Sequence, residues 1–332
     1  MTATSATDAR PTPILPSSLD VSAPVGLLLE QTTAAFEAIG MPLARRWAKT
    51  LVAAVLDVPH RELDARAAQM LSLEQRRRFE KIARQASPDV PLAYEIGRAP
   101  FLNWDFEVSR ETLIPKVDTE LFAGIVLDEL ARRPLPPEPH VLELCTGSGC
   151  LAISLAKLLP RARVVATDVS PGALAVARRN LTRHRVEDRI VLGQGDLWGP
   201  VARLAAGRPF DLVVSNPPYI PTQNIAGMGR HVAEHEPYLA LDGGADGLDP
   251  HRRILDEAAD YLAPGGRVFL EHEWYHGAHA RALAERHPGR YDDARTFTDT
   301  NNKDRALFVR RRVASGLPAH PGQAPQDLDR EG

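Results

Sequence analysis

The amino-acid sequence predicts an α/β protein in which a doubly wound, mostly parallel sheet follows a small helical domain. Two observations support this fold class. From about residue 119 onward, short apolar segments alternate with segments of helical spacing, and such alternation is typical of a parallel sheet with helices on both faces. Between about residues 25 and 86, the apolar residues recur at helical spacing alone.

Residues 21–90 are expected to form the helical domain. The apolar residues between Leu28 and Ile39 recur at helical spacing. Ser72, with Gln75 three positions later, resembles a capping box and predicts a helix start. The expected helices cover about 25–39, 43–57 and 72–86.

Residues 91–115 are expected to form a hairpin that links the two domains, because aromatic and β-branched residues cluster there. The larger domain is expected at 116–312. Its predicted strands are 140–145, 163–168, 189–193, 210–215, 266–271 and 305–311. Its predicted helices are 118–132, 149–159, 171–184 and 250–262.

Composition excludes several classes of protein. The 332 residues carry 40 Lys and Arg against 43 Asp and Glu, so a broad nucleic-acid-coating surface is disfavoured. No apolar run reaches the ~18 residues of a membrane helix, and two cysteines cannot build a disulfide framework. A cytoplasmic protein is therefore expected, with a disordered leader at 1–20 and a disordered tail at 313–332.

The first predicted strand leads into a glycine turn that indicates a cofactor site. Glu143 precedes Gly147 and Gly149, and Asp168 ends the next strand. The turn lacks the G-x-G-x-x-G pattern of nicotinamide proteins, and the acidic residue would repel a pyrophosphate. These residues instead favour a cationic cofactor, S-adenosylmethionine, with Asp168 on its ribose and Asp196 on its adenine. The predicted cofactor contacts are Glu143, Cys145, Thr146, Gly147, Gly149, Asp168, Val169, Asp196, Leu197 and Asn216.

The fourth predicted strand ends in Asn216-Pro217-Pro218-Tyr219, which indicates an acceptor site. The two prolines have no N–H, so the backbone there can only accept hydrogen bonds. Asn216 adds a side-chain carbonyl. This arrangement suits an –NH₂ group held with its lone pair toward a methyl donor, with Tyr219 stacked on a planar acceptor.

Together these motifs resemble the HemK/PrmC class of protein-glutamine N-methyltransferases, over roughly residues 25–312. The resemblance rests on Pro91–Gly97, Leu113-Ile114-Pro115, Cys145–Gly149, Asn216–Tyr219, His235-Glu236-Pro237 and Gly244–Leu248. It implies a Rossmann-like class I methyltransferase with a seven-stranded, mostly parallel sheet. It also implies that Asn216 holds the amide of a glutamine in a release factor or ribosomal protein, with Phe101 and Thr119 on the cofactor and substrate side.

The sequence departs from the family at three places. Lys116 stands where the family has arginine, Glu273 stands where it has glycine, and Trp274–Gly277 replaces a glutamine-rich continuation. Glu271 and Glu273, two residues apart at a strand end, are expected to lie on one face and to bind a cation between them. A guanidinium would fit such a pair.

The acceptor is therefore expected to be a guanidinium nitrogen of arginine, as a free amino acid or small guanidine. The alternative is the glutamine side-chain amide of a release factor or ribosomal protein. No metal, membrane or nucleic-acid partner is expected. The predicted catalytic residues are Asn216, Pro217, Tyr219, Glu271 and Glu273. The predicted substrate contacts are Phe101, Lys116, Thr119, Asn301, Asn302 and Lys303.

Three other interpretations carry less weight. His272–His276 matches the zinc-protease pattern H-E-x-x-H, but follows a strand where that chemistry needs a helix. DNA adenine methyltransferases share Asn-Pro-Pro-Tyr, yet they require a basic DNA-binding surface. A degenerate, non-catalytic binding module is disfavoured by the intact cofactor and acceptor motifs.

Overall fold

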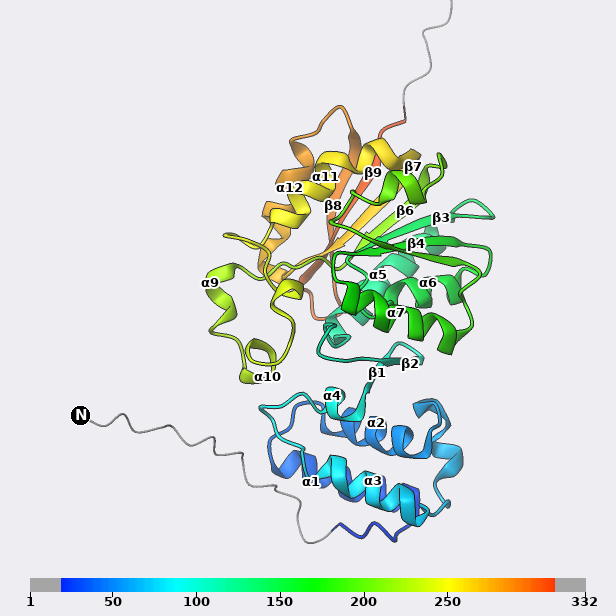
Figure 1. Cartoon of the computed structure of the whole chain (residues 1–332). Coiled ribbons are helices and arrows are strands. Elements are labelled where there is room, and N and C mark those ends of the chain that lie inside the picture. Colours follow the sequence, from blue (N-terminus) through cyan, green and yellow to red (C-terminus); the bar gives the residue numbers. More distant parts are fainter. Residues whose placement is uncertain (1–18, 314–332) are drawn as a thin grey trace, which may run out of the picture.

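The computed structural model describes residues 19–313. A helical region, a hairpin and a larger α/β region follow one another along the chain (Figure 1). Apart from residues 19, 20 and 313, the expected leader and tail lie outside the described residues. Within residues 19–313, no helix combines the length and apolar character needed to cross a membrane.

The helical region has its own apolar core, which includes the buried rings of Phe36 and Phe79. The capping box predicted at Ser72 is present: Ser72 Oγ accepts the Gln75 N–H at 3.2 Å, and Gln75 Oε1 accepts the Ser72 N–H at 2.9 Å. The elements are α1 (Val25–Ala38), α2 (Ala44–Leu56), η1 (His60–Glu62), η2 (Asp64–Arg66), α3 (Leu73–Ala83) and α4 (Leu92–Ile96).

The hairpin of β1 (Arg98–Phe101) and β2 (Trp104–Glu107) lies between the helices and the sheet (Figure 1). The guanidinium of Arg46, on α2, donates to the Pro100 carbonyl at 2.8 Å and to both carboxylate oxygens of Glu120, at 2.9 and 3.1 Å. A bidentate pair of this kind is geometrically specific. It ties the helical region to the hairpin and to the α/β region.

The larger region contains a seven-stranded sheet with the strand order β5-β4-β3-β6-β7-β9-β8. The first five strands of this order are parallel, whereas β9 is antiparallel to both β7 and β8. The predicted fold class is therefore confirmed. The strands are β3 (His140–Leu144), β4 (Arg163–Asp168), β5 (Ile190–Gln194), β6 (Phe210–Ser215), β7 (Leu262–Glu271), β8 (Tyr291–Thr298) and β9 (Asp304–Arg311).

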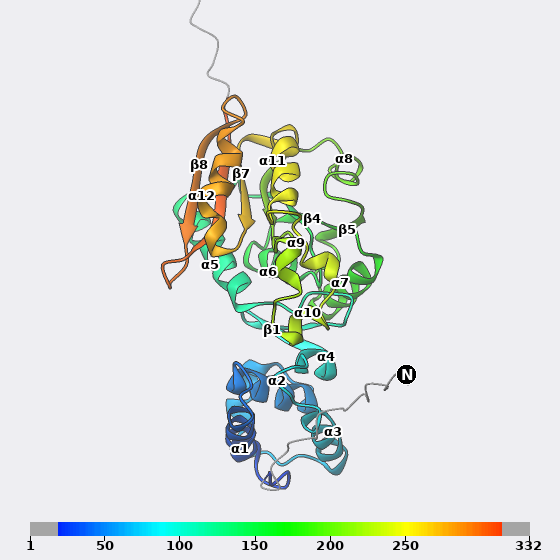
Figure 2. The same ribbon diagram turned by 90° about the vertical axis from the view of Figure 1, so that its left-hand side faces the viewer.

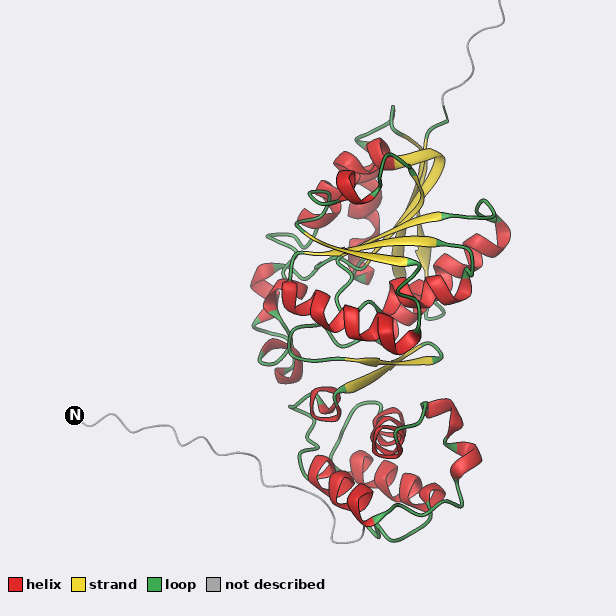
Figure 3. Cartoon of the chain, turned by 45° about the vertical axis from the view of Figure 1, so that its right-hand side comes forward, coloured by secondary structure: helices red, strands yellow, loops and turns green. Residues whose placement is uncertain are grey.

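Helices cover both faces of this sheet (Figure 3). Alternate strand residues point to opposite faces, so Val141 packs in the core beneath α5, α6 and α7, and Leu142 packs in the core beneath α8, α11 and α12. The helices are α5 (Val117–Arg132), α6 (Cys150–Leu158), α7 (Pro171–His184), α8 (Val201–Leu204), α9 (Thr222–Ile225), α10 (Arg230–Ala233), η3 (Tyr238–Ala240), α11 (Asp249–Tyr261), η4 (Trp274–His276) and α12 (Gly277–Glu285).

One strand, β8, lies outside the ranges expected from the sequence. It forms an edge of the sheet beside β9 (Figure 2). Its residues are mostly half-exposed, and Asp293 and Arg295 form ion pairs on its surface. An edge strand with charged side chains carries a weak apolar pattern, which explains why the sequence alone did not indicate it.

The strand register brings the carboxyl ends of three strands, β3, β4 and β6, to the same side of the sheet. Leu144 of β3 pairs with Thr167 of β4 on one side and with Ser215 of β6 on the other. The chain reverses its direction of winding between β3 and β6. Ligands of open α/β sheets bind at such a switch point, beyond the carboxyl ends of the strands.

Candidate active site

A cavity of about 480 Å³ opens at this switch point, a volume typical of small-molecule sites. Its floor is the turn from β3 into α6, where Cys145, Gly147 and Gly149 have φ angles of 59°, 55° and 79°. Left-handed backbone is easiest for glycine. The turn folds tightly enough for Cys145 and Gly147 to line the cavity, while Gly149 caps α6 beneath it.

Glu143 holds this turn together from below. The residue is 3% exposed, and its carboxylate accepts hydrogen bonds from the Thr146 hydroxyl and, at 3.0 Å, from the Ala152 N–H. Burial raises the pKa of Glu143 to about 8, although the hydrogen bonds from these two donors lower that pKa. A cationic ligand in the cavity would favour the ionised form of this carboxyl.

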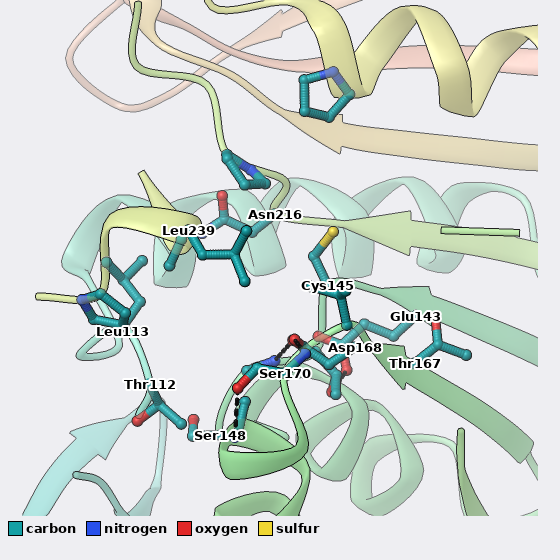
Figure 4. Close-up of a pocket in the computed structure, with 18 of the residues that line it drawn as sticks. Thr112, Leu113, Glu143, Cys145, Ser148, Thr167, Asp168, Ser170, Asn216 and Leu239 are labelled. Atoms are coloured by element: carbon teal, nitrogen blue, oxygen red, sulfur yellow. Dashed lines mark hydrogen bonds between the residues drawn. The ribbon is translucent and has the colours of Figure 1, made fainter. Parts of the chain in front are cut away.

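Asp168 ends β4 and lines the cavity beside the turn (Figure 4). Its Oδ2 accepts the Gly147 N–H at 2.8 Å, and its Oδ1 accepts the Ser170 N–H at 2.9 Å. Burial raises the pKa of Asp168 despite these bonds. Each carboxylate oxygen retains a lone pair, so the group can accept two hydroxyl donors from a ligand. Val169 lines the cavity next to it.

Asp196 and Leu197 line the cavity beyond β5. Asp196 Oδ2 accepts a hydrogen bond from Arg253 of α11 at 2.7 Å, and the Asp196 side chain is 60% exposed. Arg253 is the one cation among the lining residues, which also include Glu111, Glu143, Asp168 and Asp242. The cavity is therefore acidic.

Asn216 and Pro218 bring the end of β6 to the same cavity. The Asn216 amide group donates from Nδ2 to Thr119 Oγ1 at 3.0 Å, and its Oδ1 has no hydrogen-bond partner among residues 19–313. Pro217 lies between the two lining residues. Tyr219 directs its hydroxyl away to Glu271 Oε1 at 3.2 Å, and it is not among the cavity-lining residues.

Glu271 is fully buried behind the cavity wall. Its Oε1 accepts hydrogen bonds from Tyr219 and, at 3.3 Å, from Thr119. Burial raises its pKa to about 8, although the nearby Arg305 charge acts in the opposite direction. Arg305 is 4% exposed and pairs with Asp299 at 3.2 Å. The chain thus supplies its own guanidinium in this neighbourhood.

Glu273 does not join Glu271 on a strand face. Strand β7 ends at Glu271, and Glu273 caps η4 by accepting the Trp274 N–H at 3.2 Å. It is half-exposed and is not among the lining residues. The carboxylate pair expected to bind a guanidinium is therefore not formed around the cavity, because the alternation of side chains stops where the strand stops.

Of the other predicted substrate contacts, Thr119 lines the cavity, whereas four residues lie elsewhere. Phe101 is fully buried in the core between the hairpin and the sheet helices. Asn301, Asn302 and Lys303 are exposed in the β8–β9 connection, and Lys303 stacks its ammonium over the Trp274 ring. None of these four residues lines the cavity.

The far wall of the cavity was not indicated by the sequence. Leu113 and Pro115 come from the loop before α5, and Tyr238 and Leu239 come from η3. Leu113 and Leu239 are labelled in Figure 4. Both segments carry or adjoin motifs of the family, Leu113-Ile114-Pro115 and His235-Glu236-Pro237, and these motifs could have indicated the two segments as candidates for the cavity wall.

Lys116 and Glu236 join these two segments. The Lys116 ammonium pairs with Glu236, whose side chain is 1% exposed. Glu236 Oε2 also accepts the Ile114 N–H at 3.2 Å. Lys116, expected to contact substrate, instead ties the two segments of the cavity wall to each other.

The acidic cavity fits S-adenosylmethionine, which carries a sulfonium and an α-amino group. Glu143 is buried and Asp168 is half-buried, so both carboxyls favour positive charge or hydroxyl donors opposite them, and Asp168 retains acceptor capacity for both ribose hydroxyls. A pyrophosphate would meet carboxylates on most sides. The residues present therefore match this cofactor better than a dinucleotide.

Comparison with known proteins identifies the family. Two family models match: "PrmC N-terminal domain" over residues 28–97 and "Methyltransferase small domain" over residues 123–243. A release factor glutamine methyltransferase of Moorella thermoacetica is 38% identical over 82% of this chain and 93% of its own. One of Geobacter sulfurreducens is 45% identical over 57% of this chain and 63% of its own.

A solved structure of a release factor-specific protein-(glutamine-N5) methyltransferase from Alicyclobacillus acidocaldarius is 27% identical. It covers 62% of this chain and 99% of its own, with a TM-score of 0.38. The Moorella alignment runs through both the helical region and the sheet region. This chain belongs to the HemK/PrmC family of S-adenosylmethionine-dependent methyltransferases.

Proposed function

We propose that this enzyme methylates the side-chain amide nitrogen of a glutamine in a peptide chain release factor. The observation that carries the proposal is the uncharged site at the end of β6, where the Asn216 side-chain carbonyl oxygen has no partner within residues 19–313 and lies at the cofactor cavity. The names of the relatives support the same acceptor, since the Moorella thermoacetica protein is called a release factor glutamine methyltransferase.

A glutamine amide offers two N–H donors in one plane. Asn216 Oδ1 and the Pro217 carbonyl are two acceptors in adjacent residues, and neither proline at this turn carries a competing N–H. When both amide hydrogens are hydrogen-bonded, the substrate nitrogen is held with one face toward the methyl donor. S-adenosylmethionine supplies the electrophilic methyl group when bound. The chain contributes orientation, which lowers the entropic part of the barrier.

The arginine acceptor favoured from the sequence is not supported. That interpretation needed Glu271 and Glu273 together, and Glu273 caps a separate turn. It also needed a place for the ends of a free amino acid, and Asn301–Lys303 are exposed away from the cavity. Glu271 has Arg305 nearby, so it does not require a substrate cation.

The test is a methyl-transfer assay with labelled S-adenosylmethionine. We expect label in a release factor that carries its Gly-Gly-Gln loop, and none when the loop glutamine is alanine. Free L-arginine should give no product, and Glu273→Gly should retain turnover on the release factor. Turnover on arginine that Glu273→Gly abolishes would overturn the proposal.

A further inference from the structure

A chain of hydrogen bonds runs from Asn216 into the protein interior. Asn216 Nδ2 donates to Thr119 Oγ1 at 3.0 Å, and Thr119 Oγ1 donates to Glu271 Oε1 at 3.3 Å. Thr119 lies in the first turn of α5 and is 4% exposed, and Glu271 is fully buried. Solvent therefore has little access to the inner part of this chain.

The hydrogen bonds from Asn216 to Thr119 and from Thr119 to Glu271 both point toward the interior, because the series ends at the Glu271 carboxyl. A threonine hydroxyl has a single proton, and here that proton faces the Glu271 carboxyl. Glu271 Oε1 also accepts the Tyr219 hydroxyl at 3.2 Å, whereas Oε2 has no partner in the described part of the chain. A proton bound by this carboxyl would therefore sit on Oε2, and Oε1 would still accept. Thr119 is left with only lone pairs to offer Asn216.

This direction settles which end of the Asn216 amide is free. The –NH₂ end is engaged by Thr119, so the carbonyl end remains for a ligand. If the amide turned by 180°, its oxygen would meet the Thr119 lone pairs. Its –NH₂ group would then meet the N–H donors of an incoming amide. Two donors facing each other leave both without a partner, which is costly in a desolvated site.

We propose that Thr119 and Glu271 are positioning residues that hold the Asn216 amide with its carbonyl oxygen toward the substrate nitrogen that receives the methyl group. The proposal rests on the proposed function, because it assumes that Asn216 binds the acceptor amide. Neither Thr119 nor Glu271 needs to touch the reacting atoms. Tyr219 contributes the second donor that keeps Glu271 Oε1 committed as an acceptor.

The matched variants are Thr119→Val and Thr119→Ser. Valine keeps the shape of threonine and removes the hydroxyl, whereas serine keeps the hydroxyl and removes a methyl group. We expect Thr119→Val to lower kcat on the release factor by about tenfold to a hundredfold, since the acceptor is misaligned. Thr119→Ser should recover most of that loss. The Kd for S-adenosylmethionine, measured by calorimetry, should change less than about threefold in both.

The same substitution in an Asn216→Asp background distinguishes a positioning role of Thr119 from general damage to the fold. In Asn216→Asp, position 216 presents an acceptor oxygen in either orientation, so the direction of the amide no longer matters. Adding Thr119→Val to Asn216→Asp should cost less than about twofold. A loss as large as in the wild-type background would mean that Thr119 acts on the fold generally, and would overturn the proposal.

The side-chain amide signal of Asn216 in a ¹⁵N-correlated NMR spectrum gives a readout that needs no substrate. It is identified by its absence in Asn216→Asp. We expect one –NH₂ proton to be shifted by hydrogen bonding in the wild type and Thr119→Ser, and to lose that shift in Thr119→Val. An unchanged signal in Thr119→Val would overturn the proposal. If the wild-type protein did not methylate the release factor, the proposed function would fail, and the NMR comparison would still decide the hydrogen-bond chain.

Discussion

Asp168 accepts the backbone N–H of Gly147 at 2.8 Å, which joins the end of β4 to the turn after β3. The Asp168 carboxylate is therefore part of the turn as well as part of the cavity wall (Figure 4). A change at Asp168 acts both on the shape of the turn and on the acceptors offered to the cofactor.

Asp168→Asn should weaken cofactor binding. Asparagine has one oxygen and one –NH₂ group, so one of the two backbone donors, at Gly147 or Ser170, would face another donor. We expect the Kd for S-adenosylmethionine to rise about tenfold and the free energy of unfolding to fall by about 1–2 kcal/mol. Calorimetric titration and denaturant unfolding measure the two effects. Asp188→Asn, at an exposed position, is the matched control, and equal behaviour of the two variants would contradict the prediction.

Asn216→Ala should separate catalysis from cofactor binding. The substitution removes the acceptor oxygen at the end of β6 and leaves Asp168 and the glycine turn intact. We expect kcat to fall by about 10²–10³-fold, with the cofactor Kd within about threefold of the wild-type value. Asn301→Ala, in the exposed β8–β9 connection, should keep wild-type turnover. Joint loss of turnover and cofactor binding in Asn216→Ala would show that the acceptor site is misplaced.

Glu236→Gln should loosen the far wall of the cavity. The change removes the charged acceptor of Lys116 at a buried position, although the Lys116 side chain itself is 33% exposed. We expect the free energy of unfolding to fall by about 1–2 kcal/mol and the cofactor Kd to rise. The control is Glu234→Gln, whose pair with Arg230 is exposed and should contribute little to stability. Similar losses in both variants would argue against a specific role for Glu236.

Glu271→Gln should reduce the loss of stability between about pH 4.5 and pH 8. Burial raises the Glu271 pKa from its ordinary 4.5 to about 8 in the folded state. In this range the unfolded chain releases a proton that the folded chain keeps, so the folded state loses relative stability as pH rises. Each unit of pKa difference corresponds to about 1.4 kcal/mol. A neutral glutamine removes this contribution.

The measurement is denaturant unfolding of the wild type and Glu271→Gln at several pH values. We expect the stability difference between the two proteins to shift by a few kcal/mol in favour of Glu271→Gln as pH rises to 8. Glu143, whose pKa burial also raises to about 8, is unchanged in both proteins and cancels in the difference. A pH-independent difference would mean that Glu271 is not a desolvated carboxyl.

Local sequence signals predicted most of the fold. The capping box at Ser72 and Gln75 formed as expected, because its two bonds join residues three positions apart. The parallel strands were indicated by their apolar character, which follows from burial on both faces. The edge strand β8 was missed because its charged residues are stabilised by ion pairs with distant partners, such as Arg295 with Glu129.

The candidate site also has a part that the sequence predicts and a part that it does not. The residues after β3, β4 and β6 could be predicted to meet, since the carboxyl ends of parallel strands share an edge. The contact between the wall segments that contain Leu113 and Leu239 could not be predicted, because Lys116 and Glu236 make it from positions 120 residues apart. Arg253 was missed for the same reason, since it reaches Asp196 from α11.

The sequence by itself determined the α/β sheet, the acidic glycine turn after β3 and the position of the Asn-Pro-Pro-Tyr motif after β6. Each depends on short-range backbone geometry and on alternation along a strand. Only the tertiary structure decided the surroundings of Glu271. Residues two positions apart share a face only within a strand. Because β7 ends at Glu271, Glu273 does not lie on the same face. The partners of Glu271 come instead from α5 and from the turn after β6, and long-range packing alone brings those groups together.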